Sequence, residues 1–345
     1  MTVSHILIIF HLSYSQRENR FATRFTPLFM TYKGNAMSTD KGTYKKTYKM
    51  TVKKYQLVYS QLFFTLILLT SLKSFASECT DANLIDLVKT PYVNPADVHS
   101  KLSCLEEYLL FHGDRRAIFL SVYRMVTATM AESIELGVYE NKQWITDYLV
   151  IFADKYREAF YNYETKNLMA IPGSWIIAFD TAKRGENLIL QDVALGMTAH
   201  ITRDLAHAIH DVGIAPNQAS RLRDHRKVNE YLAFVYADIN LMLSDLYGPG
   251  IDDIFLEKPA GPVLAQLTGK GMVAVRDRAW LHGVLLTKMP GIFYRLVDWY
   301  IEKTSVNTAF LALSPKINPV VFKRLHEMEG SDPLSAFCSK FPCKQ

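Results

Sequence analysis

Residues 199–211 read AHITRDLAHAIHD and residues 224–230 read DHRKVNE, and these two stretches hold four of the ten histidines in the chain. At 100° per residue, one narrow stripe of the first stretch is polar, and it carries His200, Asp204, His207 and Asp211. Apolar residues gather on the opposite side, namely Ile201, Leu205, Ala208, Ile209 and Val212. This spacing predicts an amphipathic helix within residues 188–212.

A second helix is predicted over about residues 222–247, and two polar residues interrupt its apolar face. His225 and Asn229 share that face with Leu232, Tyr236, Ile239 and Leu243. Polar groups on a core-facing stripe need hydrogen-bond partners. The connection between the two helices is long enough to fold the second helix back antiparallel on the first. We therefore expect this polar pair to meet His200 and Asp204.

Helical patterns cover the chain after residue 77, and the alternating pattern of β-strands is nearly absent. Asn94 followed by Pro95 predicts the cap and first residue of a helix that runs to Phe111. Other helices are expected over residues 115–136, 144–163, 175–183, 272–288, 291–303 and 319–329. No linker rich in Pro, Gly or Ser divides this region. The sequence thus predicts an all-α fold, with a single compact multi-helix domain over residues 77–345.

Residues 1–76 have the order of a leader that ends in a secretory signal. A cluster of five lysines precedes an apolar run at residues 57–72, and a small-residue cleavage site follows at Ala76. An uncleaved membrane anchor is the alternative, but the run is shorter than the roughly 20 apolar residues of a membrane span. Residues 1–49 precede a conventional signal start at Met50 and represent either a mis-start or a long leader. We expect a secreted or periplasmic protein that meets the membrane only through its signal segment.

Removal of this leader reverses the sign of the net charge. The whole chain has a formal charge of +5, but residues 1–76 contain 11 of its 39 basic and 2 of its 34 acidic residues, which leaves −4. The remaining chain lacks the basic face that tracks phosphates in nucleic-acid-binding proteins. We therefore expect no nucleic-acid partner.

The four cysteines all lie after the leader. An even number of cysteines in an exported chain favours disulfides. We expect the local pairs Cys79–Cys104 and Cys338–Cys343, one of three possible connectivities, to staple the two ends of the domain. A metal site is the alternative, but no Cys-x-x-Cys motif is present.

Several short motifs are shared with a known family. They are Gly113-Asp114, Phe119-x-x-x-Tyr123-x-x-x-Thr127, the run from Leu195 to Leu205, His225-x-x-x-Asn229 and Arg278-Ala279-Trp280. Over residues of about 90–290 the chain resembles the uncharacterised family called domain of unknown function 5995. The resemblance implies a predominantly helical fold and no established activity. The chain departs from the family pattern at Thr198, Thr202 and Ala206, where we expect Asn, Asn and Pro.

The sharpest functional hypothesis is a divalent metal ion, zinc or a similar ion, held between two helices. Its mixed nitrogen and oxygen ligands would be His200, Asp204, His225 and Asn229. One turn further on, His207 would act as a general base for a metal-bound water, and Asp211 would orient it. The protein would then be an exported metal-dependent hydrolase acting on an ester or phosphoester.

Two other hypotheses explain the same residues without a metal ion. In the first, His200–Asp204 and His225–Asn229 are hydrogen-bonded pairs that fix helix packing in a purely structural protein. In the second, a secreted or periplasmic binding protein holds an apolar, lipid-like or anionic small molecule, which predicts a deep apolar cavity beside His225. The motifs of serine hydrolases, zincins and phosphate loops are absent from the sequence.

Overall fold

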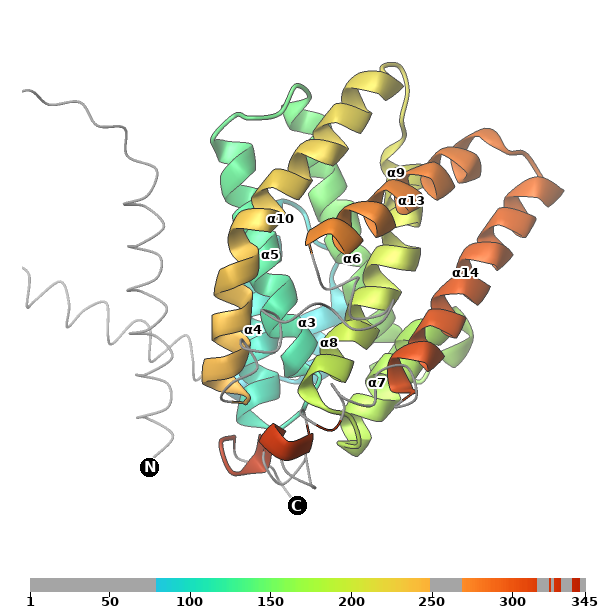
Figure 1. Cartoon of the computed structure of the whole chain (residues 1–345). Helices are drawn as coiled ribbons and strands as arrows, with labels where there is room; N and C mark the ends of the chain where they lie inside the picture. The colour runs from blue at the N-terminus through green and yellow to red at the C-terminus, as the bar shows by residue number, and fades with distance from the viewer. Residues whose placement is uncertain (1–78, 249–268, 315–322, 324–325, 330–336, 342–345) are drawn as a thin grey trace, which may run out of the picture. The chain divides into compact units, whose positions relative to one another are not determined.

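The computed structural model describes residues 79–248, 269–314, 323, 326–329 and 337–341 (Figure 1). Within these residues every regular element is a helix and no strand occurs, which confirms the predicted all-α domain. None of the described helices is both long and apolar enough to cross a membrane. The leader, its cleavage site and the mis-start predicted before Met50 lie outside the described residues.

Residues 249–268 lie outside the described part of the chain, and short connections join the described helices up to residue 246 and again after residue 269. Their bounds are α3 (Leu84–Lys89), α4 (Pro95–Phe111), α5 (Ala117–Glu135), α6 (Lys142–Glu164), η1 (Leu168–Ala170), α7 (Gly173–Arg184), α8 (Ile189–Met197), η2 (Thr198–Asp204), α9 (Leu205–Val212), α10 (Gln218–Leu246), α13 (Gly269–Lys288) and α14 (Ile292–Leu313). The last of these continues ten residues beyond its predicted end at Lys303. Only part of the helix predicted over residues 319–329 is described.

Local sequence signals account for several helix ends. The Asn94 side chain accepts a hydrogen bond of 2.9 Å from the Asp97 backbone N–H, and Pro95 occupies the first turn of α4. Just after α5, Gly137 adopts a φ of +69°, a conformation that glycine reaches without strain. The start of α4 at Asn94 and Pro95 was predicted from the sequence, and the structure confirms it.

Aromatic side chains from α5, α6 and α7 form the centre of the core. Trp175, Tyr156 and Phe160 are each fully buried. Trp175 stacks on Phe179 with ring centroids 5.0 Å apart, and its centroid lies 5.3 Å from that of Tyr156. The aromatic residues of the middle of the chain therefore pack the domain together.

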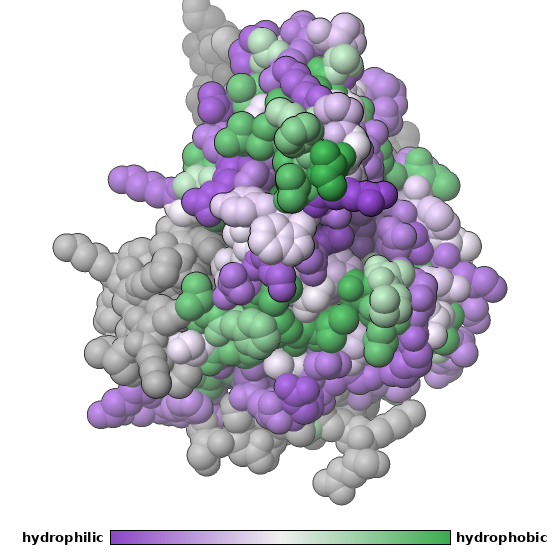
Figure 2. Space-filling view, turned by 90° about the vertical axis from the view of Figure 1, so that its right-hand side faces the viewer, coloured by the Kyte–Doolittle hydropathy of each residue, from purple (hydrophilic) through white to green (hydrophobic). Residues whose placement is uncertain are grey.

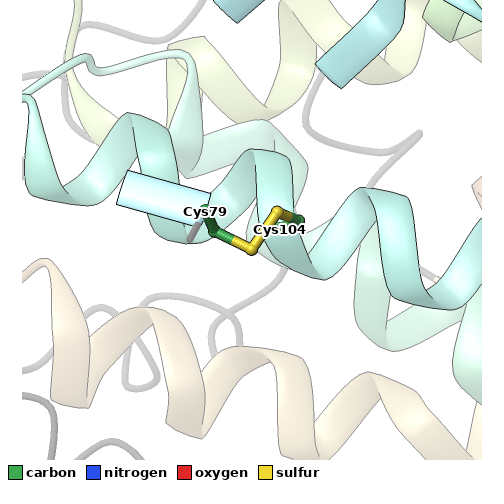
Figure 3. The surroundings of a disulfide bond; sticks show 2 residues. All are labelled: Cys79 and Cys104. Atoms are coloured by element: carbon green, nitrogen blue, oxygen red, sulfur yellow. A yellow bond between two sulfur atoms is a disulfide. The ribbon is translucent and has the colours of Figure 1, made fainter. Parts of the chain in front are cut away.

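A disulfide joins Cys79 to Cys104, with Cα atoms 5.2 Å apart (Figure 3). This bond confirms the first predicted pair and ties the start of the described chain to α4. Cys338 is also disulfide-bonded. Its predicted partner, Cys343, lies outside the described residues, so the second pairing stays a prediction.

The helix next to α9 is not the one that we expected from the sequence. α9 packs against α13 and α6, while α10 packs against α5 and α13 (Figure 1). Gly283 of α13 makes this close packing possible, because a Cβ atom there would lie 2.6 Å from Ile209 Cβ and 2.9 Å from the Ala206 carbonyl oxygen. α10 makes almost no contact with α8, η2 or α9, so the predicted antiparallel packing of the second helix on the first is wrong.

A π-helical turn, η2, separates α8 from α9. The Leu205 backbone N–H reaches back to the carbonyl oxygen of His200, five residues earlier, instead of four. Each π turn contains more residues than an α turn, so residues after it rotate away from the stripe calculated at 100° per residue. This rotation separates His207 and Asp211 from His200 and Asp204.

The N-terminus of α8 is held by a buried carboxyl group. The Ile189 backbone N–H donates a hydrogen bond of 2.8 Å to Glu329 Oε2, and Glu329 is only 6% exposed. Burial raises the pKa of Glu329 from 4.5 to about 7. The folded protein therefore holds this proton more tightly than the unfolded chain does.

We expect the Glu329 carboxyl group to make stability depend on pH between about 4.5 and about 7. Its stabilising contribution, on the order of 3 kcal/mol, is complete below pH 4.5 and is lost as the pH rises through 7. Glu329→Gln, which keeps an acceptor for Ile189, should flatten this part of the curve of unfolding free energy against pH. Glu327→Gln, at an exposed position two residues away, should leave the curve unchanged. An unchanged slope in the Glu329 variant would contradict the prediction.

Candidate apolar cavity and its polar walls

An apolar cavity of about 90 Å³ lies among α5, α6, η2, α10 and α13. Nearly all of the surface that faces it is apolar. The residues of its wall are Phe119, Val122, Tyr123, Val126, Thr127, Met130, Ile145, Tyr148, Leu149, Phe152, Met197, His200, Ile201, Val228, Leu232, Met272 and Arg276. Side chains from these helices and Met197 of α8 therefore line one space. The small-molecule-binding hypothesis expected such a space beside His225, but His225 is not among the wall residues.

Helical spacing brings these wall residues to one place. Those of α5 recur every three or four residues between Phe119 and Met130, and those of α6 do the same between Ile145 and Phe152. α8 approaches α5 closely because residue 196 is glycine, and a Cβ atom there would lie 2.2 Å from the Phe119 ring. A larger residue at this position would displace a ring of the wall.

His200 forms part of the wall and is oriented by a carboxylate. Its Nδ1 lies 3.1 Å from Asp204 Oδ2, and the same oxygen accepts a hydrogen bond of 2.7 Å from Trp175 Nε1. The imidazole stacks on Phe152 with ring centroids 3.7 Å apart. Tyr123 meets the imidazole edge-on at 4.5 Å. The predicted His200–Asp204 hydrogen bond is therefore present.

Burial also sets the protonation state of this pair. Burial lowers the pKa of His200, and the hydrogen bond to Asp204 opposes this shift only in part. The neutral ring must then use its Nδ1–H to donate to the carboxylate, which leaves a lone pair on Nε2. Among the described residues Nε2 has no hydrogen-bond partner. The wall thus includes an acceptor that no described side chain uses.

His225 and Asn229 both bind Arg276 of α13, a residue that is 3% exposed. Arg276 donates from Nε to Asn229 Oδ1 at 2.8 Å and from Nη2 to the His225 carbonyl oxygen at 2.9 Å. In return, His225 Nε2 donates to the Arg276 carbonyl oxygen at 3.1 Å. The Tyr148 hydroxyl donates to His225 Nδ1 at 3.0 Å. Burial and the neighbouring guanidinium hold the pKa of His225 well below its usual value, so the ring is neutral.

This arrangement does not fit the metal ion that we predicted. The ligand set of His200, Asp204, His225 and Asn229 does not assemble, because the last two residues hold a guanidinium instead. A second cation beside Arg276 would be repelled. In the part of the chain that the structure describes, no three His, Cys, Asp or Glu side chains are placed to hold a metal ion.

The two residues predicted to act as base and orienting group face other partners. His207 Nε2 lies 2.8 Å from Asp298 Oδ1 on α14. Asp211 pairs with Lys155 at 2.6 Å and is 38% exposed. Neither residue belongs to the cavity wall. The structure does not bring His207 and Asp211 together with His200.

Sequence reasoning missed the two residues that complete the polar network, Tyr148 and Arg276. A signal for Arg276 was present, because it lies one helical turn from Met272 and Trp280 on the apolar face of the predicted helix over 272–288. An arginine on such a face needs buried partners. Tyr148 had no comparable signal, since it is one of many aromatic residues in its helix.

The model of one protein family, described as a family of unknown function (DUF5995), matches residues 96–315. The chain belongs to this family. The match confirms the resemblance inferred from the short motifs. No curated protein and no solved structure matches the chain. The DUF5995 region contains every residue of the cavity wall and the whole Arg276 network, so the family match supports the fold around the cavity without naming an activity.

Proposed function

We propose that this protein binds a small apolar molecule in the cavity among α5, α6, η2, α10 and α13. The observation that carries the proposal is a partly open space of about 90 Å³ with an almost entirely apolar wall. Cavities of this kind exclude water and accept apolar ligands, as a larger engineered cavity of about 150 Å³ does with benzene. The ligand would be a molecule of a few carbon atoms, or the short apolar end of a longer, lipid-like molecule.

The energetics favour occupation of this space. An empty apolar cavity costs about 24 cal/mol for each Å³. For 90 Å³ this amounts to about 2 kcal/mol, which a ligand would recover by restoring van der Waals contacts. The wall residues belong to helices that are already packed together, so few side chains lose conformational freedom when a ligand binds.

Partly exposed side chains in the wall provide a route of entry. Met197, Ile201 and Met272 all line the cavity and are only partly buried. Methionine side chains are flexible and adapt to ligands of different shape. Within the wall, the free lone pair of His200 Nε2 could accept a hydrogen bond from a hydroxyl group on the ligand.

Export forms part of the proposal. The Cys79–Cys104 disulfide fits an oxidising compartment, such as the periplasm or the extracellular space. The signal-like order of residues 1–76 supports the same compartment. The protein would then act as a secreted or periplasmic small-molecule-binding protein.

The metal-dependent hydrolase has weaker support than ligand binding. It rests on the spacing of histidine and aspartate residues in the sequence. The described geometry directs two of the predicted ligands to Arg276 and separates His207 from the cavity. The apolar cavity needs no such rearrangement, and for this reason we place binding first.

We expect benzene or toluene to bind the wild-type protein and to raise its melting temperature, with about 1 kcal/mol of stabilisation at tenfold excess over Kd. Val126→Phe fills the space with a ring from α5 and should weaken binding at least tenfold. Val93→Phe adds the same ring at a position that is 76% exposed and should leave binding unchanged. Isothermal calorimetry and thermal unfolding measure both effects. Failure of either ligand to bind the wild type, or equal binding by the Val126 variant, would contradict the proposal.

A further inference from the structure

One face of α14 and the turn before it expose large apolar side chains. We call the residues of this face the α14 stripe: Met289, Ile292, Phe293, Leu296, Trp299 and Tyr300. Their exposed fractions range from 38% to 63%. They recur every three or four residues and therefore lie along one side of the helix. Figure 2 views the side of the molecule on which α14 lies and shows hydrophobic side chains grouped on its surface.

The opposite face of α14 packs into the hydrophobic core. Ile301 is fully buried with Ala206 and Leu286, and Tyr294 and Val297 pack against this cluster. A helix that is apolar on both faces normally has both faces covered. Folding of the domain covers only one face of α14, so another apolar surface is needed to cover the α14 stripe.

The charges near the α14 stripe are arranged by sign. Asp298 and Glu302 are held by partners in the domain, at 2.8 Å from His207 and 2.7 Å from Arg203. The basic residues Lys288, Arg295 and Lys303 are exposed, and they form no ion pair with any described residue. Positively charged side chains that can bind an external anion therefore flank the α14 stripe, although residues 77–345 have a net formal charge of −4.

We propose that the α14 stripe docks on the surface of a lipid bilayer that contains anionic lipids. Tryptophan and tyrosine prefer the interface between lipid and water, where an apolar ring and a polar tip are both satisfied. Lys288, Arg295 and Lys303 would meet the negative headgroups. A helix of this kind lies in the interface and does not span the bilayer. The docking surface goes beyond the proposed cavity and does not depend on it.

Trp299 allows a direct test on the full chain. The other three tryptophans, Trp144, Trp175 and Trp280, are buried, and residues 1–76 contain no tryptophan. Quenching of tryptophan fluorescence by vesicles of brominated phosphatidylcholine therefore reports on α14 and not on the apolar leader. We expect quenching with vesicles that also contain phosphatidylglycerol, and about tenfold weaker binding to brominated phosphatidylcholine alone.

Variants of the stripe complete the test. Trp299→Phe should abolish the quenching while binding persists in vesicle flotation. Phe293→Ser with Leu296→Ser should weaken vesicle binding about tenfold or more. Phe234→Ser, at a residue of α10 that is 61% exposed, is the matched control and should leave binding unchanged.

Two outcomes would overturn the proposal. The first is an absence of tryptophan quenching, or quenching that persists in Trp299→Phe. The second is dimerisation in light scattering that the Phe293 and Leu296 changes abolish, without vesicle binding. In that case a second copy of the chain would cover the stripe.

Discussion

Arg276→Met is expected to lower the free energy of unfolding by about 3–5 kcal/mol, because it removes the centre of a buried hydrogen-bond network. The guanidinium donates to Asn229 Oδ1 and to the His225 carbonyl oxygen. Methionine replaces the length of the side chain but none of its donors. The buried His225 carbonyl oxygen would lose a charged donor, at a cost of about 1–3 kcal/mol, and the half-buried Asn229 side chain would lose its donor as well.

Chemical denaturation with circular dichroism measures this loss. Arg278→Met is the matched control, because Arg278 lies on the same helix with an exposed side chain. It should change the unfolding free energy by less than about 0.5 kcal/mol. A loss below about 1 kcal/mol in the Arg276 variant would show that these hydrogen bonds do not stabilise the folded protein.

Asp204→Ala is expected to destabilise the fold by about 3 kcal/mol. Asp204 is 1% exposed and accepts hydrogen bonds from Trp175 Nε1 and His200 Nδ1. Burial acts to raise the pKa of Asp204, but the hydrogen bonds from His200 and Trp175 and the positive charge of Arg203 lower it, so the carboxylate is ionised in the fold. Its removal leaves two buried donors without an acceptor.

Asp211→Ala provides a matched control for this change. Asp211 was assigned to the same polar stripe as Asp204, but it is 38% exposed and, among the described residues, forms an ion pair with Lys155 alone. Exposed ion pairs contribute little, so we expect a loss of at most about 0.5 kcal/mol. Thermal unfolding of the two variants compares them directly. Equal losses would contradict the view that η2 places one aspartate in the core and the other near the surface.

The fold class could be predicted because helices leave local marks in the sequence. Caps such as Asn94 and helix stops such as Gly137 act within a few residues, and apolar spacing reveals which face of each helix is buried. The His200–Asp204 pair could be predicted for the same reason, since its two members lie four residues apart. Pairing of Cys79 with Cys104 followed from cysteine number and proximity in the sequence.

The partners of His225 and Asn229 could not be predicted in this way. Periodicity showed that these residues face the core, but it did not show which helix would lie opposite them. Arg276, which binds both, comes 51 residues after His225. Its helix packs between the two expected partners because Gly283 lets α13 approach α9 closely.

The sequence by itself determined that the described part of the chain forms helices, and which of their faces are buried. It also placed polar residues at two sites, on the stripe of His200 and Asp204 and on the apolar face that holds His225 and Asn229. Only the tertiary structure decided that a guanidinium satisfies one of these polar sites, and that an apolar cavity lies between it and His200. The physical reason is the distance along the chain over which each interaction acts. Backbone hydrogen bonds and caps act between neighbours in the chain, whereas a cavity and a buried network depend on the packing of several helices at once.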